Sequence, residues 1–95
     1  MILNIVDFTV SDTVATLTRF NETATAVRSR TGCLQYEIFT DPSAPARLLI
    51  VQKWADMAAF DAYRAGSEMA AQMAGMGPLM TGAPLSVTLS VTAMG

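Results

Sequence analysis

Few residues of this chain could act as acids, bases or nucleophiles, because its 95 residues include no histidine and a single cysteine. Without histidine, a Ser-His-Asp triad, a histidine-ligated metal and an imidazole proton relay are excluded. Tyr63 is a candidate catalytic residue, since its hydroxyl could orient a phenol or exchange a proton with it. Asn4 and Asp7 point to opposite faces of one predicted strand, so one of them faces its apolar side. A buried carboxylate needs a partner or has a raised pKa, which makes Asp7 a candidate general base.

A second set of residues could surround a small apolar or aromatic molecule. Met69, Met73, Met76 and Met80 recur at spacings of four, three and four, which is one face of a helix. Methionine fills irregular gaps, so this face could be an adaptable wall for a flat ligand, although core packing explains the same pattern. The candidate binding residues are Asn4, Tyr36, Gln52, Trp54, Phe60, Met69 and Met73.

Several of these residues also have an ordinary structural explanation. Trp54 could anchor the core where a strand meets a helix. Tyr63 could lie at the surface or at a dimer seam with only its hydroxyl in water. Gln52 and Tyr36 could be solvated or paired across neighbouring strands. The residue types alone leave these alternatives open.

Four segments have the pattern of β-strands. Residues 2–10, 33–40 and 47–54 are rich in β-branched and aromatic residues. The apolar run in 47–54 is typical of a central strand. From residue 85 to 92, apolar and hydroxyl residues alternate, which is the period of a strand with two different faces. Residues 41–45 are expected to form a turn whose two prolines exclude ladder pairing.

Three further segments have the signals of helices. Apolar residues recur at spacings of three and four over residues 14–27, and again from residue 57 onward. A short third helix is expected over residues 68–76. The expected cap and stop residues are Ser11 or Asp12 and Gly32 for the first helix, Asp56 and Gly66 for the second, and Ser67 for the third.

The resulting order, β-α-β-β-α-(α)-β, is that of a ferredoxin-like α+β fold, in which an antiparallel sheet carries its helices on one face. We expect a single domain over residues 1–95. The strands at 2–10 and 47–54 are apolar on both faces, whereas the helices can cover only one. A monomer would therefore expose a large apolar patch. We expect two copies to pack face to face as a homodimer, which gives a dimeric α+β barrel.

The composition excludes several classes of function. The chain is 52% hydrophobic and carries a formal net charge of −2, so it lacks the basic surface of a nucleic-acid binder. Residues 69–95 carry no charge, but glycines and prolines interrupt them, so we expect no membrane span. Cys33 has no second thiol for a disulfide or a zinc site, and we expect it to be a small buried hydrophobe. This cysteine usage and the absence of a signal-peptide pattern favour a cytoplasmic location.

Gly32, Cys33 and Tyr36 begin a strand after the first helix, and Trp54 ends a later strand one spacer before Asp56. This spacing and the order of the elements resemble the antibiotic biosynthesis monooxygenase domain, a family of dimeric α+β barrels. The similarity runs over residues 1–80 and includes a Gly-Pro-Leu-Met segment before the last strand. The resemblance implies oxygenation of phenolic or quinol-like substrates in an apolar pocket, with no metal, flavin or other cofactor.

Three positions depart from the family pattern. Gln52 stands where an acidic residue precedes the tryptophan by two, and Tyr63 stands where a histidine often follows it by nine. Gln72 stands where the haem-degrading branch has its haem-ligating histidine, which excludes that mode of haem binding. The leading hypothesis is a cofactor-independent monooxygenase acting on a small aromatic, quinol or polyketide-like substrate. The alternative is a non-catalytic small-molecule-binding or accessory dimer of the same fold.

Overall fold

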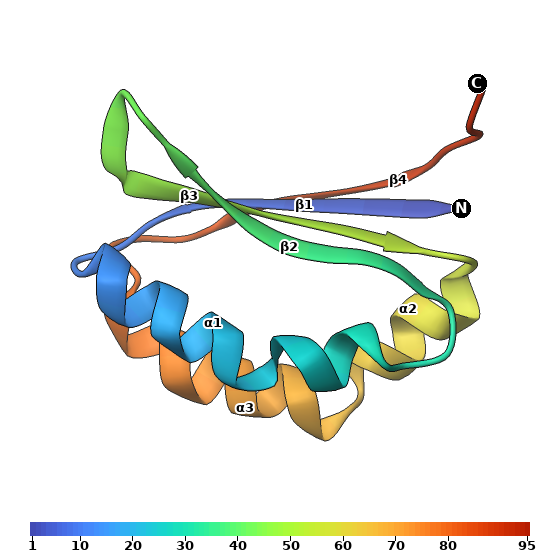
Figure 1. The fold of residues 1–95 in the computed structure, drawn as a ribbon, viewed down its shortest axis with the longest axis horizontal. Helices are drawn as coiled ribbons and strands as arrows, with labels where there is room; N and C mark the ends of the chain where they lie inside the picture. Colours follow the sequence, from blue (N-terminus) through green and yellow to red (C-terminus); the bar gives the residue numbers. More distant parts are fainter.

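The computed structural model describes all 95 residues and confirms the predicted order of elements (Figure 1). The strands are β1 (Ile2–Thr9), β2 (Cys33–Asp41), β3 (Ala44–Trp54) and β4 (Leu85–Ser90). The helices are α1 (Thr13–Arg28), α2 (Met57–Arg64), α3 (Ser67–Met76) and the short 3-10 helix η1 (Gly77–Leu79). Antiparallel pairing in the order β2-β3-β1-β4 gives one four-stranded sheet, and the helices lie on one face of it. The fold is therefore the predicted α+β ferredoxin-like fold, and none of its helices is long and apolar enough to span a bilayer.

The register of the sheet places side chains in rows across the strands. One row under the helices joins Asn4 of β1 to Gln52 of β3 and Thr88 of β4. The next residue of β1 is Ile5, which is paired with Val51 on the opposite face. Because successive residues of a strand point to opposite faces, a polar row lies beneath the helices and an apolar row lies behind it.

Aromatic side chains fill the space between the sheet and the helices. Phe20 stacks on Tyr36 with ring centroids 4.9 Å apart, and Trp54 stacks on Tyr63 at 5.0 Å. Phe60 of α2 contacts the second pair, with its centroid 6.4 Å from that of Trp54. All of these side chains are buried. Stacked rings stabilise a core beyond the area they bury, so the cluster holds α2 firmly against β3.

The N-termini of α1 and α2 are capped as predicted. Asp12 accepts a hydrogen bond from the Ala15 N–H at 2.9 Å, and Asp56 accepts one from the Ala59 N–H at 2.9 Å. Each carboxylate satisfies a donor that has no partner inside its helix.

The start of α3 differs from the prediction of a Ser67 cap. Gly66 takes the cap position without a side-chain bond, and Ser67 is already the first helical residue. A Cβ at position 66 would lie 2.8 Å from Arg30 Nη1, which donates to Glu68 Oε2 at 2.7 Å. The ion pair of Arg30 and Glu68 therefore lies directly beside the helix start, and a side chain at position 66 would have to displace the end of Arg30.

Gly32 lies beyond the first helix rather than at its end. Helix α1 ends at Arg28 with Ser29 as its C-cap, and Gly32 has a φ of +83° in the turn before β2. A Cβ here would lie 2.6 Å from the Cβ of Ala59. The glycine thus permits both the left-handed backbone and the close approach of this turn to α2.

The hairpin between β2 and β3 is tighter than predicted. Its loop consists of Pro42 and Ser43, and Asp41 accepts from the Ser43 N–H and hydroxyl at 2.9 and 2.8 Å. Pro45 lies inside β3, contrary to the expectation that both prolines stay outside the ladder. It is tolerated because the register is irregular between Asp41 and Thr40, so Pro45 pairs with no residue of β2.

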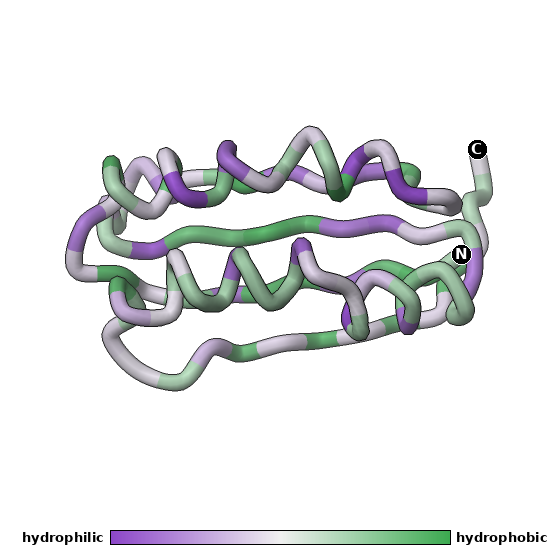
Figure 2. Tube along the Cα trace, turned by 90° about the horizontal axis from the view of Figure 1, so that it is seen from below, coloured by the Kyte–Doolittle hydropathy of each residue, from purple (hydrophilic) through white to green (hydrophobic).

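β4 forms the exposed edge of the sheet beside β1. Every residue from Leu85 to Ser90 is exposed, and Figure 2 shows this strand alternating between hydrophobic and near-neutral segments. The strand ends at Ser90, earlier than the predicted residue 92, and β1 ends at Thr9. Val10 continues only as an isolated bridge to Met80.

The face of the sheet opposite the helices has no cover within the chain, and we call it the open face (Leu3, Ile5, Leu49, Val51, Leu85, Val87 and Leu89). On β4, Leu85, Val87 and Leu89 are 64%, 43% and 46% exposed. The tip of the β2–β3 hairpin and the C-terminal residues also lie on this side (Figure 1). The second apolar face predicted from the strands is therefore present.

Candidate functional site

A cavity of about 100 Å³ lies between the helix-covered face of the sheet and helices α2 and α3. Its lining side chains are Asn4, Val6, Gln52, Phe60, Tyr63, Arg64, Met69, Ser86 and Thr88. The structure thus brings together most of the candidate residues from the sequence, namely Asn4, Gln52, Phe60, Tyr63 and Met69. Strands β1, β3 and β4 supply one wall and the two helices supply the other.

Asn4 connects the cavity to the edge strand. Its amide Nδ2 donates to Thr88 Oγ1 at 2.9 Å, to Ser86 Oγ at 3.1 Å and to the Val87 carbonyl at 3.2 Å. Asn4 is the member of the Asn4–Asp7 pair that faces the helices, and it is buried. Its hydrogen bonds fix the hydroxyl side chains of β4 at the cavity wall.

Tyr63 belongs to a buried polar network behind the cavity. Its hydroxyl lies 3.4 Å from the Tyr36 hydroxyl and donates to Gln72 Oε1 at 3.3 Å. Gln72 Nε2 in turn donates to the Tyr36 hydroxyl. Burial raises the pKa of both phenols above their usual value, so both stay protonated at neutral pH. Tyr36, a candidate binding residue, therefore lies behind Tyr63 rather than in the cavity wall.

Trp54 also supports the cavity from behind. Its ring is fully buried against Tyr63, and its Nε1 donates to Gln52 Oε1 at 3.0 Å. This bond orients the Gln52 amide so that its N–H groups remain as donors. The structure thus places Trp54 as an anchor that positions Gln52 and Tyr63, which is the core role that its sequence position also allowed.

Arg64 is the one cationic side chain of the cavity lining. Its guanidinium lies 4.5 Å from the centroid of the Phe60 ring and donates from Nη2 to Asp61 Oδ1 at 2.6 Å. The side chain is about half exposed, so it lies where the cavity meets solvent. The stacking on Phe60 and the ion pair together restrict its position.

Two candidate residues lie away from the cavity. Asp7 is on the other side of the sheet, where Arg47 donates to both of its carboxylate oxygens at 2.6 and 2.9 Å and lowers the pKa of Asp7. A general base would have to face the cavity, whereas Asp7 faces the opposite side of the sheet and does not line it. Met73 is 41% exposed, while Met76 is buried in the core, so the methionines do not form one continuous wall. Only Met69 lines the cavity.

Several residues of the cavity and its surroundings, besides the predicted candidates, have only weak signals in the sequence. The hydroxyl face of the last strand contains Ser86 and Thr88, and the polar partner of both is Asn4. Arg64 directly follows the candidate Tyr63 but shows no pattern of its own. The sequence indicates Gln72 only as a replacement for the histidine of the haem-degrading branch. In the structure its buried amide is hydrogen-bonded to Tyr36 and Tyr63.

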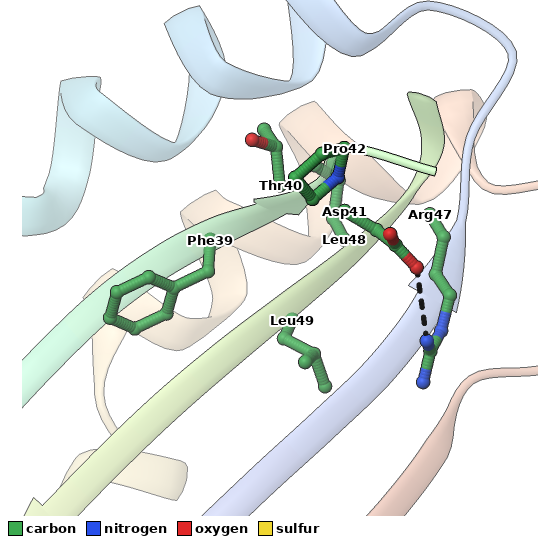
Figure 3. Close-up of a pocket in the computed structure, with 7 residues that line it drawn as sticks. All are labelled: Phe39, Thr40, Asp41, Pro42, Arg47, Leu48 and Leu49. Atoms are coloured by element: carbon green, nitrogen blue, oxygen red, sulfur yellow. Dashed lines mark hydrogen bonds and ion pairs between the residues drawn. The ribbon is translucent and has the colours of Figure 1, made fainter. Parts of the chain in front are cut away.

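Other hollows lie elsewhere on the surface. One of about 220 Å³ lies beside the β2–β3 hairpin, where Phe39, Leu49 and the Arg47–Asp41 ion pair surround it (Figure 3). A wider groove of about 880 Å³ runs between the turn at Gly32 and the alanines of α2. Neither of these two contains a candidate catalytic or binding residue. A third hollow, of about 190 Å³, lies at the start of β2 and includes the candidate binding residue Tyr36 in its lining. No three Asp, Glu or Cys side chains lie close enough together to hold a metal ion.

The family model for antibiotic biosynthesis monooxygenase matches residues 1–75, which include the strands and helices that form most of the cavity. The chain belongs to this family. No match was found among curated proteins.

Solved structures with the same fold include proteins named as antibiotic biosynthesis monooxygenases. A protein from Nitrosomonas europaea is 14% identical, with a TM-score of 0.90 and coverage of 98% of this chain and 100% of its own. One from Caulobacter crescentus is 23% identical, with a TM-score of 0.90 and coverage of 97% and 90%. Rv0793 from Mycobacterium tuberculosis is 19% identical, with a TM-score of 0.86 and coverage of 98% and 96%. At these identities the likeness establishes the shared fold of the monooxygenase family.

Proposed function

We propose that this family member is a cofactor-independent monooxygenase that binds a small phenol or quinol in the cavity beside Tyr63. The proposal rests on one observation, namely that the cavity wall has apolar side chains in one part and hydrogen-bonding side chains in another. Val6, Phe60 and Met69 offer apolar contact to an aromatic ring. Gln52 and Tyr63 offer hydrogen bonds to the oxygen atoms on that ring. Small-molecule pockets in general combine an apolar lining with a few placed polar groups.

In the proposed reaction the substrate itself supplies the electrons. An anthrone-type substrate loses a proton to give an enolate, which reacts with O₂ at its former methylene carbon. One oxygen atom becomes the new carbonyl oxygen, and the other leaves as water with the two hydrogens of the methylene group. The carbon gives up the four electrons that reduce O₂, so the reaction balances without a further reductant. A dry cavity protects the reactive intermediate from side reactions.

Tyr63 acts in this proposal as a hydrogen-bond donor rather than as a base. Burial raises the pKa of its hydroxyl, so the phenol is neutral at physiological pH and can stabilise an oxyanion on the substrate. Its present bond to Gln72 is long, at 3.3 Å, and a substrate oxygen can compete for the same proton.

The volume of the cavity limits the substrate that fits without rearrangement. An apolar cavity of roughly 150 Å³ holds one benzene ring, and this cavity measures about 100 Å³. A single ring therefore requires small side-chain shifts, and a polycyclic substrate requires larger ones. Met69 is the flexible lining side chain that could make way.

We further propose that the protein works as a cytoplasmic homodimer. The open face carries seven apolar side chains on the side that the helices leave bare, beside the ion pair of Asp7 and Arg47. Packing it against the same face of a second copy would remove this surface from water with two-fold symmetry. The free, partly buried thiol of Cys33 suits a reducing compartment.

Oxygen uptake with anthrone and with a reduced naphthoquinone tests the proposed activity. We expect protein-dependent consumption of O₂ above autoxidation, with one ¹⁸O atom from labelled O₂ in the oxygenated anthrone. Tyr63→Phe should lower the rate, because it removes the proposed donor and keeps the ring that stacks on Trp54. Uptake at the autoxidation rate with every quinol and anthrone would contradict the proposal.

A binding protein without catalytic activity is the second candidate. The ionisable side chains that line the cavity are Tyr63 and Arg64, and both are protonated at neutral pH. Neither can accept the first proton from a substrate, so turnover requires a substrate acidic enough to lose it to water. Tight binding of quinols without protein-dependent oxygen uptake would favour this second function.

A further inference from the structure

Several hydrogen-bond donors of the cavity wall have no partner once the bonds within the chain are made. Ser86 and Thr88 both accept from Asn4, and their own hydroxyl protons have no partner in the chain. Gln52 accepts from Trp54 through its oxygen, so its amide hydrogens point toward the Tyr63 side of the cavity. A wall with unused donors selects a ligand that carries acceptor oxygens.

Arg64 adds a positive charge to the same wall. Its Nη2 is engaged by Asp61, while Nε and Nη1 have no hydrogen-bond partner in the chain. The stack on Phe60 holds the guanidinium beside the ring surface that would contact an aromatic ligand. An arginine held in this way still offers single charge-assisted N–H donors from Nε and Nη1 to a carboxylate.

The carboxylates near the cavity are already paired. Asp61 is bound to Arg64, and Glu68 at the start of α3 is bound to Arg30 at 2.7 Å. Neither Asp61 nor Glu68 lines the cavity, whose charged lining residue is Arg64. Arg64 is therefore the one charged group that reaches the cavity directly, and its countercharge, Asp61, lies outside the lining.

We propose that the natural ligand is an aromatic acid, a phenolic or quinol ring that bears a carboxylate. The ring would lie against Phe60 and Met69, and the carboxylate would meet Arg64 and the free hydroxyls of β4. This proposal rests on the proposed function, since it names the substrate class of the same cavity. It also gives Arg64 a role in specificity that is separate from any role of Tyr63 in the reaction.

The test compares two ligands that differ only by the carboxylate. Hydroquinone and 2,5-dihydroxybenzoate are titrated into the protein without oxygen at neutral pH, and the dissociation constants are measured by calorimetry. We expect the acid to bind about tenfold more tightly, which corresponds to one charge-assisted hydrogen bond at a half-exposed site. Raising the salt concentration should weaken binding of the acid and leave hydroquinone unchanged.

Arg64→Gln should abolish the preference, so that the dissociation constants of the two ligands measured on this variant become about equal. Arg19→Gln is the matched control, because Arg19 is also half exposed and paired with an acid at i,i+3, in its case Glu22 on α1. Thr88→Val, which removes a neutral donor, should reduce the preference in part. Thermal unfolding followed by circular dichroism confirms that each variant is folded.

The outcomes separate this inference from the proposed function. Equal binding of both ligands to the wild type, or a preference that survives in Arg64→Gln, overturns the assignment of an aromatic acid to Arg64 and leaves the quinol site intact. Failure of both ligands to bind overturns the quinol site itself, and the inference falls with it.

Discussion

Asn4 and Ile5 are neighbours in β1 and lie on opposite faces of the sheet. Asn4 is 3% exposed beneath the helices and makes three hydrogen bonds to β4. Ile5 lies on the open face, paired with Val51 and Val87, where the chain provides no cover. At this point of the sheet, the row through Asn4 on the covered face is polar and the row through Ile5 on the uncovered face is apolar. This is the reverse of what burial alone favours. The covered face leaves a cavity that could hold a small molecule. The open face leaves apolar side chains that a second protein chain could cover.

The largest effect is expected from a charge on the open face. Val87→Glu on the edge strand would place two carboxylates in the proposed two-fold interface, and each unpaired buried charge costs about 3–5 kcal/mol. We expect the dimer dissociation constant to rise by more than about 100-fold, so that sedimentation equilibrium finds monomers at micromolar concentration.

Val14→Glu is the matched control for this substitution. Val14 lies on α1, on the helix side of the molecule, and is 76% exposed. The same change there should leave the oligomeric state as it is. A wild-type protein that sediments as a monomer at micromolar concentration would show that the open face has no second copy as its partner.

The next effect concerns the covered face. Tyr63→Phe should reduce quinol-dependent oxygen uptake by about 100-fold, the lower range for loss of a group that assists proton transfer or stabilises charge in the transition state. Tyr36→Phe removes a hydroxyl that lies behind the cavity and should have a smaller effect on the rate. If the two variants lose the same activity, the hydroxyl network acts only through packing.

The titration of the two tyrosines measures how dry the covered face is. Their pKa values are raised by burial, so tyrosinate absorbance should appear only well above pH 10, with half of the amplitude left in Tyr63→Phe. Neutral phenol is the form favoured by folding, so this stability is fully present below the unfolded pKa of 10.0 and is lost as pH rises above it. Denaturant unfolding at pH 8 and pH 11 checks the sign. An ordinary tyrosine titration in the native state would show that water reaches both rings.

The smallest effect is expected at Asp7. Arg47 lowers the pKa of this exposed carboxyl, so the ion pair contributes stability above the unfolded pKa of 3.8 and loses it as pH falls through the native value. Asp7→Asn should slightly lower the urea midpoint at pH 7, and its difference from the wild type should shrink as pH falls below 3.8. Because the residue lies on the open face, binding of hydroquinone should not change. A loss of quinol binding in this variant would show that Asp7 contributes to the binding site.

The fold was predictable because local signals agreed with the global pattern. Caps at Asp12 and Asp56 and the period of the strands all support one order of elements. The errors concern places where tertiary contacts override local preference. Ser67 is a good cap residue, but α3 begins one residue earlier, with Gly66 at the cap position and the ion pair of Arg30 and Glu68 beside it.

The site was predictable only in part, for a geometrical reason. The choice between Asn4 and Asp7 depends on which face of β1 the helices cover, and the pattern of apolar residues on both faces does not decide it. Arg64 and Gln72 acquire their roles from neighbours that are distant in sequence, such as Tyr36. Met73 belongs to the predicted methionine face, yet α3 is rotated so that this residue points outward.

The side-chain amide of Asn4 also affects the tendency of the chain to aggregate. β4 is exposed along its whole length and is attached to β1 by its ladder and by the bonds from Asn4 to residues 86–88. If β4 detaches, β1 becomes an open strand edge with apolar residues on both faces, which is a template for pairing with other chains. Asn4 therefore lines the cavity and also helps to keep β4 paired with β1, which keeps this strand edge of β1 covered.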